Sequence, residues 1–319
     1  MPKTPPPSSV RLGLLQMASG SEVKANMKKA LAGIREAAAQ GAQIICLQEL
    51  FRSLYFPQKE EAHYFNGAEP IPGPTTELLS EAARKFKVVL VASLFEKRTE
   101  GIYHNTAAIL DADGSLVGKY RKMHIPDDPG FFEKFYFTPG DLGFQTFQTH
   151  YAKIGVLICW DQWFPEAARL TALSGAQILI YPTAIGWLDR EPAELREVQR
   201  SGWELIQRSH ALANGVFVAS VNRVGKEGKI QFWGSSFVAN PLGQVIQKAA
   251  LQKEEILIAD CPLHQIRETR EGWPFLRDRR IDAYEDLTSR FLDFDKVGAR
   301  RRTASSAAKP RASLLRKES

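Results

Sequence analysis

Short apolar runs alternate with longer amphipathic stretches through most of the sequence, and this alternation constrains the fold more than any other feature. In the first half, strand-like runs at 10–17, 43–47 and 88–95 are separated by helix-like stretches at 22–40 and 75–86. Short apolar runs are typical of buried strands, and apolar residues spaced three and four apart are typical of helices. Strands that alternate with helices indicate an α/β domain with helices on the faces of its sheets.

The second half repeats this order. Its predicted strands lie at 153–159, 177–181, 216–221, 233–239 and 255–260, and its predicted helices at 165–174 and 193–213. An antiparallel hairpin in each half adds an α+β character. We therefore predict two sheets packed face to face with helices outside, in one domain at 9–295. A disordered leader at 1–8 and a basic disordered tail at 296–319 flank it.

The net charge of +6 is concentrated at the C-terminal end of the chain. Residues 296–319 hold eight lysines and arginines and one acid, a net charge of +7, which leaves −1 for residues 1–295. A nucleic-acid-binding body is expected to present a positive face. The nearly neutral body therefore argues against a nucleic-acid partner, although binding through the tail stays open as a remote alternative.

The sequence has no membrane-spanning stretch, no recognisable secretory signal and few cysteines, and these features predict the compartment. No stretch reaches the roughly 18 consecutive apolar residues that a membrane-spanning helix needs, and residues 1–10 lack the apolar segment of a secretory signal. Only three cysteines occur, at 46, 159 and 261, too few and too unevenly paired for a disulfide framework. We therefore expect a cytoplasmic protein without a membrane partner.

Three reactive side chains follow predicted strands, where open α/β sheets bind ligands. Glu49 follows the run QIICL, Lys122 lies in KYRKMHIP, and Cys159 ends the run KIGVLIC. A thiol needs a base to become a nucleophile, and none of the six histidines has a partner pattern. A buried glutamate can act as that base, and a lysine can stabilise an oxyanion. Each residue taken alone is ordinary, but together they form a coherent catalytic set.

The segments LQELF, KYRKMHIP and ICWDQWFPEAAR, in this order, resemble the nitrilase superfamily of carbon–nitrogen hydrolases. The resemblance covers about residues 9–290. It implies a four-layer αββα sandwich, no metal, no organic cofactor and a homo-oligomer. It also implies a catalytic set of Glu49 as base, Lys122 as oxyanion partner and Cys159 as nucleophile. Glu133, in FFEKFYFTPGD, matches the position of a further glutamate that orders the lysine.

Further segments between Lys122 and Arg280, among them YPTAIGW and QFWGSSFVA, resemble the branch of this superfamily that hydrolyses N-carbamoylputrescine. That resemblance implies a small linear ureido substrate with a distal amine, and putrescine, carbon dioxide and ammonia as products. The backbone N–H of Trp160 is the expected second oxyanion donor. An amine tail calls for carboxylates and aromatic faces. The further residues that we predict to bind substrate are Tyr55, Asp128, Trp187 and Trp233.

Two other functions stay open at this point. A related amidase acting on a β-ureido acid would need a cation for an anionic tail, and Arg52 or Arg190 could supply it. A catalytically silent interaction module on the same fold is disfavoured, because all four of the expected catalytic residues are present.

Overall fold

The computed structural model describes residues 8–292. These residues form two compact units, one ending at Phe275 and one beginning at Leu276, and each is described by itself. The predicted tail at 296–319 and all but Ser8 of the predicted leader lie outside the described residues. The predicted domain boundary at residue 295 lies outside them too, so it stays a prediction.

The first unit contains two six-stranded sheets of similar construction. Parallel strands occupy the middle of each sheet and antiparallel strands the edges. One sheet has the order β17-β1-β2-β3-β4-β5, with β17 at Glu255–Pro262, β1 at Ser9–Gln16, β2 at Ile44–Leu47, β3 at Val89–Thr99, β4 at Ile102–Leu110 and β5 at Leu116–Arg121. The other has the order β16-β15-β12-β10-β9-β8, with β16 at Val245–Lys248, β15 at Phe237–Ala239, β12 at Phe217–Asn222, β10 at Ile178–Thr183, β9 at Lys153–Val156 and β8 at Thr146–Gln148.

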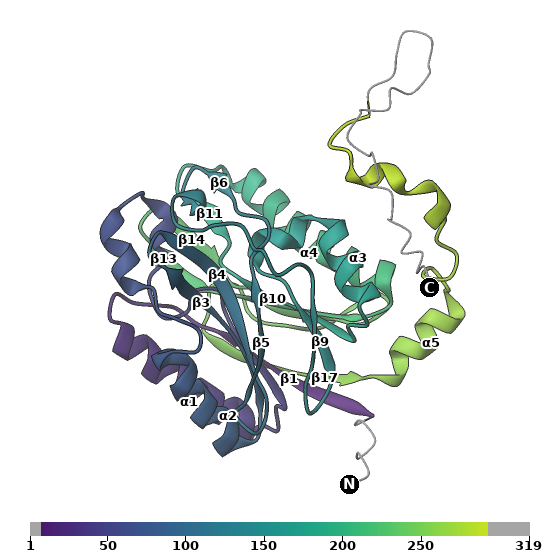
Figure 1. Cartoon of the computed structure of the whole chain (residues 1–319), viewed down its shortest axis with the longest axis horizontal. Coiled ribbons are helices and arrows are strands. Elements are labelled where there is room, and N and C mark those ends of the chain that lie inside the picture. Colours follow the sequence, from purple (N-terminus) through teal and green to yellow (C-terminus); the bar gives the residue numbers. More distant parts are fainter. Residues whose placement is uncertain (1–7, 293–319) are drawn as a thin grey trace, which may run out of the picture. The chain divides into compact units, whose positions relative to one another are not determined.

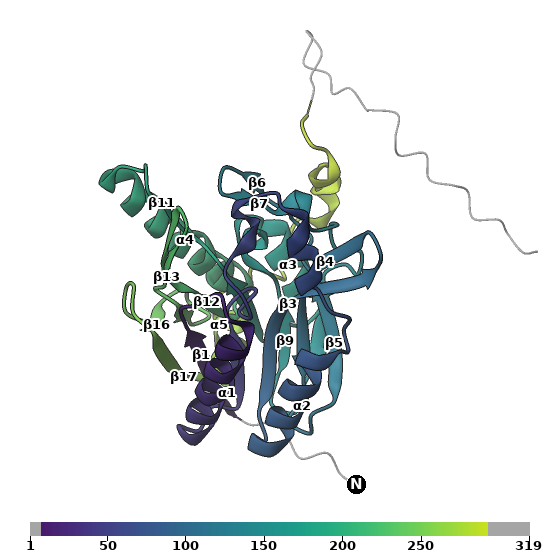
Figure 2. The same cartoon turned by 90° about the vertical axis from the view of Figure 1, so that its left-hand side faces the viewer.

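Helices cover the outer face of each sheet, so the layers run helix, sheet, sheet, helix (Figure 1, Figure 2). Helices α1 (Val23–Ala39) and α2 (Pro74–Phe86) pack on the first sheet. Helices α3 (Pro165–Leu173) and α4 (Ala193–Asn214) pack on the second. In α1 the buried residues include Met27, Ala30, Ile34 and Ala37, the three- and four-residue spacing that places apolar groups on one helix face. The predicted four-layer αββα sandwich is confirmed.

The core between the two sheets brings their inner faces into contact. It contains Leu14 and Cys46 from the first sheet and Val156, Ile180 and Val218 from the second, all buried. A separate apolar cluster lies between the first sheet and helices α1 and α2. Strands β2 and β9, which precede Glu49 and Cys159 in the sequence, both contribute to this shared core.

Two small sheets lie beyond the main pair. The three-stranded one has the order β11-β14-β13, with β11 at Gly186–Leu188, β14 at Ile230–Trp233 and β13 at Val224–Glu227. The two-stranded one pairs β6 (Asp127–Asp128) with β7 (Phe131–Phe132). Helix α5 (His264–Gly272) follows β17. The second unit contains short 3-10 turns at Ile281–Ala283 and Glu285–Thr288.

Two predicted strands end differently in the structure. The predicted strand at 233–239 is wrong, because the chain divides into β14 and β15 at Gly234 and Ser235, whose φ angles are +67° and +54°. Such angles cannot continue an extended strand. The strand predicted at 153–159 ends at Val156, and Cys159 begins a 3-10 turn over Cys159–Trp163. The small sheets and α5 were not predicted from the sequence.

Candidate active site

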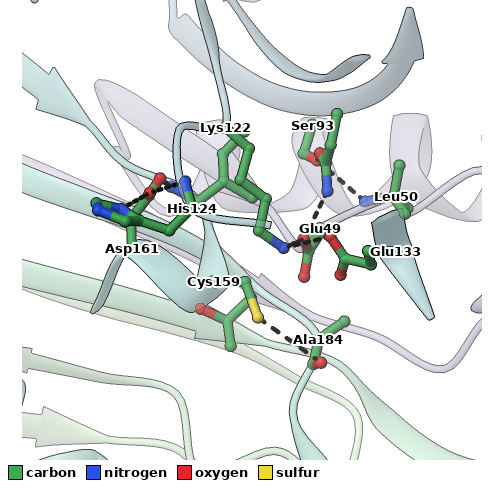
Figure 3. A network of polar contacts seen from close by, with 12 residues as sticks. Glu49, Leu50, Ser93, Lys122, His124, Glu133, Cys159, Asp161 and Ala184 are labelled. Atoms are coloured by element: carbon green, nitrogen blue, oxygen red, sulfur yellow. Dashed lines mark hydrogen bonds and ion pairs between the residues drawn. The ribbon is translucent and has the colours of Figure 1, made fainter. Parts of the chain in front are cut away.

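Lys122 lies between two glutamates that are distant from each other along the chain (Figure 3). Its Nζ donates to Glu49 Oε1 at 2.8 Å and to Glu133 Oε2 at 2.7 Å. All three side chains are completely buried. Removing charges from water costs several kcal/mol per ion unless they are paired and hydrogen-bonded. The two carboxylates provide that pairing, so the structure brings the predicted base, lysine and second glutamate into one cluster.

Glu49 lies just beyond β2, after Gln48, and is held by a chain of polar side chains from β3 and β4. Its Oε1 also accepts from Asn105 Nδ2 at 2.7 Å, while Ser93 Oγ donates to Asn105 Oδ1 at 2.9 Å. The backbone N–H of Leu50 donates to Ser93 Oγ at 3.2 Å. Glu49 Oε2 is buried and accepts from no described group. One oxygen of the carboxylate is therefore fixed, and the other is free to accept a proton.

Cys159 occupies a backbone conformation that is uncommon for a residue with a side chain. Its φ is +44°, in the left-handed region, where strain is typical of functional sites. The side chain is buried, and its Sγ lies 3.9 Å from the carbonyl oxygen of Ala184. Figure 3 shows the Cys159 side chain in the same view as the Lys122 cluster, and Glu49, Lys122 and Glu133 all act electrostatically on its thiol. The tight turn thus presents the thiol to the charged cluster.

The protonation states follow from burial and from the neighbouring charges. Burial, together with Glu49 and Glu133, raises the pKa of the Cys159 thiol, and Lys122 opposes that rise. The thiol is therefore protonated at neutral pH and needs a base. Burial disfavours the charge of Lys122, but Glu133 and Glu49 raise its pKa above the ordinary value. Burial raises the pKa of Glu133 to about 7, although Lys122 acts in the opposite direction.

The turn of residues Cys159–Trp163 is tied to the first sheet by Asp161. Its Oδ2 accepts from the Ile158 N–H at 2.9 Å and from the Tyr120 hydroxyl at 2.8 Å. Its Oδ1 lies 3.0 Å from the His124 backbone nitrogen and 2.7 Å from His124 Nδ1. The sequence shows no partner pattern for His124, and the structure pairs it with Asp161 and not with the Cys159 thiol. The pairing joins residues 37 positions apart, which no local pattern reveals.

The residues predicted to bind substrate are placed as follows. The Tyr55 hydroxyl donates to Glu133 Oε1 at 2.6 Å, which brings this tyrosine into the charged cluster. Trp160, directly after the nucleophile, is half-buried. The indoles of Trp187 and Trp233 lie 5.3 Å apart, and both side chains are buried. Asp128 lies exposed in β6. No measured contact with a substrate tests these assignments, so they stay predictions.

Three further residues near the cluster were missed. All three are completely buried: Asn105 lies on β4, Ser93 lies on β3, and Arg223 directly follows β12. A polar residue in an apolar run was the available signal for Ser93 and Asn105, within SLF and YHNTAAIL. Arg223 follows the apolar run of β12, but the backbone carbonyls that it binds lie about 170 residues earlier in the chain, beyond any sequence pattern.

Within residues 8–292, no group of three or more histidine, cysteine, aspartate or glutamate side chains is placed to hold a metal ion. No helix among the same residues is long and apolar enough to cross a membrane.

A buried cysteine near a Glu–Lys–Glu cluster on an αββα sandwich is the arrangement expected of a cysteine-dependent carbon–nitrogen hydrolase. Residues 11–271 match the model of the carbon-nitrogen hydrolase family. The chain belongs to this family, as the sequence predicts. An N-carbamoylputrescine amidase of Solanum lycopersicum is 45% identical, covering 87% of this chain and 94% of its own. A citrullinase of Francisella tularensis is 39% identical, covering 89% and 100%. The crystal structure of a carbon-nitrogen hydrolase from Helicobacter pylori superposes with a TM-score of 0.86 at 47% identity, covering 89% and 99%.

Proposed function

We propose that this protein hydrolyses N-carbamoylputrescine to putrescine, carbon dioxide and ammonia, with Cys159 as nucleophile. The observation that carries the proposal is the buried Glu49–Lys122–Glu133 cluster beside the Cys159 thiol. The 45% identity to a plant N-carbamoylputrescine amidase over most of both chains supports the choice of substrate. The reaction would be a step of putrescine, and hence polyamine, biosynthesis.

The first half of the reaction transfers the carbamoyl group to sulfur. Glu49 takes the thiol proton of Cys159, and the thiolate attacks the ureido carbonyl carbon. Lys122 and the backbone N–H of Trp160 hold the developing oxyanion, and preorganised donors of this kind contribute about 2.7–4 kcal/mol each. Glu49 then returns the proton to the leaving nitrogen, so ammonia departs and a carbamoyl thioester remains.

The second half regenerates the enzyme. Glu49 accepts a proton from a water molecule, and the hydroxide attacks the thioester carbonyl. The carbon–sulfur bond breaks, and the proton returns to the sulfur of Cys159. The released carbamate decomposes to carbon dioxide and the free amine. Because the same carboxylate alternates between base and acid, one oxygen must stay unengaged between steps, as Glu49 Oε2 does among the described groups.

Glu133 and the aromatic residues serve binding and orientation in this proposal. Glu133 holds Lys122 and the substrate nitrogen, and the hydroxyl of Tyr55 in turn holds Glu133. Trp187 and Trp233 supply an aromatic wall for the methylene chain of the substrate. Asp128, exposed on the β6–β7 hairpin, supplies negative charge for the distal amine.

The rival substrates can be separated by one assay. Arg52, one of the two candidate cations for a β-ureido acid, is paired with Glu69 at 2.9 Å, which disfavours Arg52 as the partner of an anionic tail. We expect ammonia release from N-carbamoylputrescine with a kcat/KM at least about tenfold above those for β-ureidopropionate and citrulline, a difference of about 1.4 kcal/mol. A higher kcat/KM for either acid would replace the proposed substrate while keeping the chemistry.

We also propose that the protein acts in the cytoplasm as a homo-oligomer, and the outer face of α4 supports self-association. Val198 and Leu205 on this face are 65% and 64% exposed. Gly202 lies between them, and a Cβ added there would meet no described atom within 4 Å. Glycine inside a helix costs about 1 kcal/mol relative to alanine. Since nothing described within the chain requires this glycine, close approach of a second α4 in an antiparallel pair offers a reason for it.

Sedimentation velocity tests this association. Leu205→Glu should reduce the mass of the particle to that of a smaller assembly, because it places a charge at the centre of the apolar contact. Leu78→Glu, on the exposed face of α2, is the matched control and should leave the mass unchanged. An unchanged mass for Leu205→Glu would exclude α4 as the contact.

A further inference from the structure

Arg223 is a completely buried arginine at the junction of β12 and β13, on the sheet opposite the one that carries Glu49. We propose that Arg223 is a positioning residue for the general base: it fixes the loop of residues 49–55 and touches no substrate. This inference rests on the proposed function, since it assigns a role toward the base of that reaction.

The guanidinium binds the backbone of the loop directly. Arg223 Nη2 donates to the carbonyl oxygens of Glu49 at 3.1 Å, Leu50 at 3.0 Å and Ser53 at 3.2 Å. Leu50 has a φ of +49°, an uncommon conformation that persists only where the surroundings enforce it. The three carbonyls converge on one cation, so the path of the chain after Glu49 depends on this single side chain.

A carboxylate completes the arrangement. Glu227 lies 2.9 and 3.0 Å from Arg223 Nη1 through its two oxygens. Its Oε2 also accepts from the backbone N–H of Tyr55 at 2.6 Å. Arg223 therefore holds the first part of the loop through its carbonyl oxygens, and Glu227 holds the end of the loop through the N–H of Tyr55.

The two ends of the loop carry the two side chains that approach the Lys122 cluster. Glu49 accepts from Lys122 directly, and Tyr55 donates to the Glu133 carboxylate that accepts from the same ammonium. A displacement of the loop would therefore change the base and the second glutamate together. Misplacement of a catalytic group by about 1 Å can cost 10²-fold in rate.

Only an arginine matches this geometry. The guanidinium carbon lies 5.3 Å from the ring centre of Phe232 and 6.0 Å from that of Tyr55, so the planar group packs against two aromatic rings that also contact each other. A lysine has one nitrogen and cannot bind three carbonyls and a bidentate carboxylate at once. Buried ion pairs add little net stability compared with apolar residues of the same volume, and the positioning role gives this pair a purpose beyond stability.

The test compares Arg223→Lys and Glu227→Gln with Lys226→Gln in the full chain. Lys226 lies in the same hairpin, in an exposed pair with Asp189. We expect Arg223→Lys to lower kcat for N-carbamoylputrescine about 10²-fold, with KM changed less than about threefold because no substrate contact is lost. Glu227→Gln retains an acceptor oxygen and should lower kcat about tenfold, a smaller loss of the same kind. Lys226→Gln should match the wild type.

A second readout does not depend on the substrate assignment. The rate at which iodoacetamide alkylates Cys159, followed by mass spectrometry, reports how well Glu49 activates the thiol, and it should fall in parallel with kcat. If the wild type does not turn over N-carbamoylputrescine, the proposed substrate fails, but alkylation still tests Arg223. Folded Arg223→Lys with wild-type alkylation would overturn the inference, as would a loss confined to KM. If Arg223→Lys does not fold, Glu227→Gln decides by the same two criteria.

Discussion

The turns that carry Glu49 and Cys159 are both held in place by groups of the opposite sheet, but with donors and acceptors exchanged. Each follows a short buried strand, and each contains a residue with positive φ, Leu50 in one and Cys159 in the other. In the Glu49 turn, backbone carbonyl oxygens accept hydrogen bonds from Arg223, which follows a strand of the opposite sheet. The Cys159 turn contains its own carboxylate, Asp161, which accepts from groups of the opposite sheet. In both cases the partner lies across the sandwich, so the approach of Glu49 and Cys159, the proposed base and nucleophile, depends on how the two sheets pack.

The largest loss of activity is expected when Cys159 is replaced, because Cys159 and Glu49 are proposed to act together in the attack on the substrate carbonyl. Cys159→Ala should lower kcat/KM by at least about 10⁴-fold, and adding Glu49→Gln should cost little more, because residues that act as a unit are not additive. Ammonia release and a melting curve for each variant provide the measurements. Cys46→Ala, which removes another buried thiol of the same core, should keep turnover. Full multiplicative losses in the double variant would mean that the two turns act in separate steps.

A smaller effect is expected from the support of the nucleophile turn. Asp161→Asn replaces one acceptor oxygen with an NH2 group, so at least one donor facing Asp161 loses its partner. We expect kcat to fall about 10²-fold while the protein remains folded, as judged by circular dichroism. Asp260→Asn makes the same change in an exposed pair with Arg11 and should be nearly silent. Wild-type kcat for Asp161→Asn would show that the Cys159 turn needs no support from the first sheet.

The smallest effect concerns a charged network outside both turns. Burial disfavours the charge of Glu96, but Arg121, Lys119 and Thr106 lower its pKa to about 2 from the ordinary 4.5. The ionised form is thus favoured in the folded state, which contributes about 3 kcal/mol above pH 4.5 that is lost as the pH falls toward 2.

Urea unfolding at pH 7, 4 and 3 measures this contribution. The wild type should lose unfolding free energy over that range, and Glu96→Gln should lose about 2 kcal/mol less, because its side chain does not titrate. Roughly 1 kcal/mol of the Glu96 contribution is still present at pH 3, above its folded pKa of about 2. Equal pH dependence in the two proteins would place the acid sensitivity elsewhere, for example in the support of one of the turns.

Much of this architecture can be predicted from the sequence, because it rests on local patterns. The alternation of strands and helices gave the two-sheet sandwich, and Glu49, Lys122 and Cys159 follow strands or strand ends as expected. The roles of Arg223 and Asp161 could not be predicted. Arg223 binds backbone carbonyls, which every residue carries, so no side-chain pattern marks its partners. The break at Gly234 and Ser235 was missed because strand-forming residues surround it on both sides.

The shared core between the sheets has a consequence for how the protein would fail on heating. Glu49 and Cys159, the proposed base and nucleophile, follow strands of different sheets. A slight expansion of that core would therefore separate them without breaking any hydrogen bond inside either sheet. Turnover would then decline at temperatures where the circular dichroism spectrum is still native. On heating, loss of activity would therefore result first from separation of the two sheets, and only at higher temperature from unfolding.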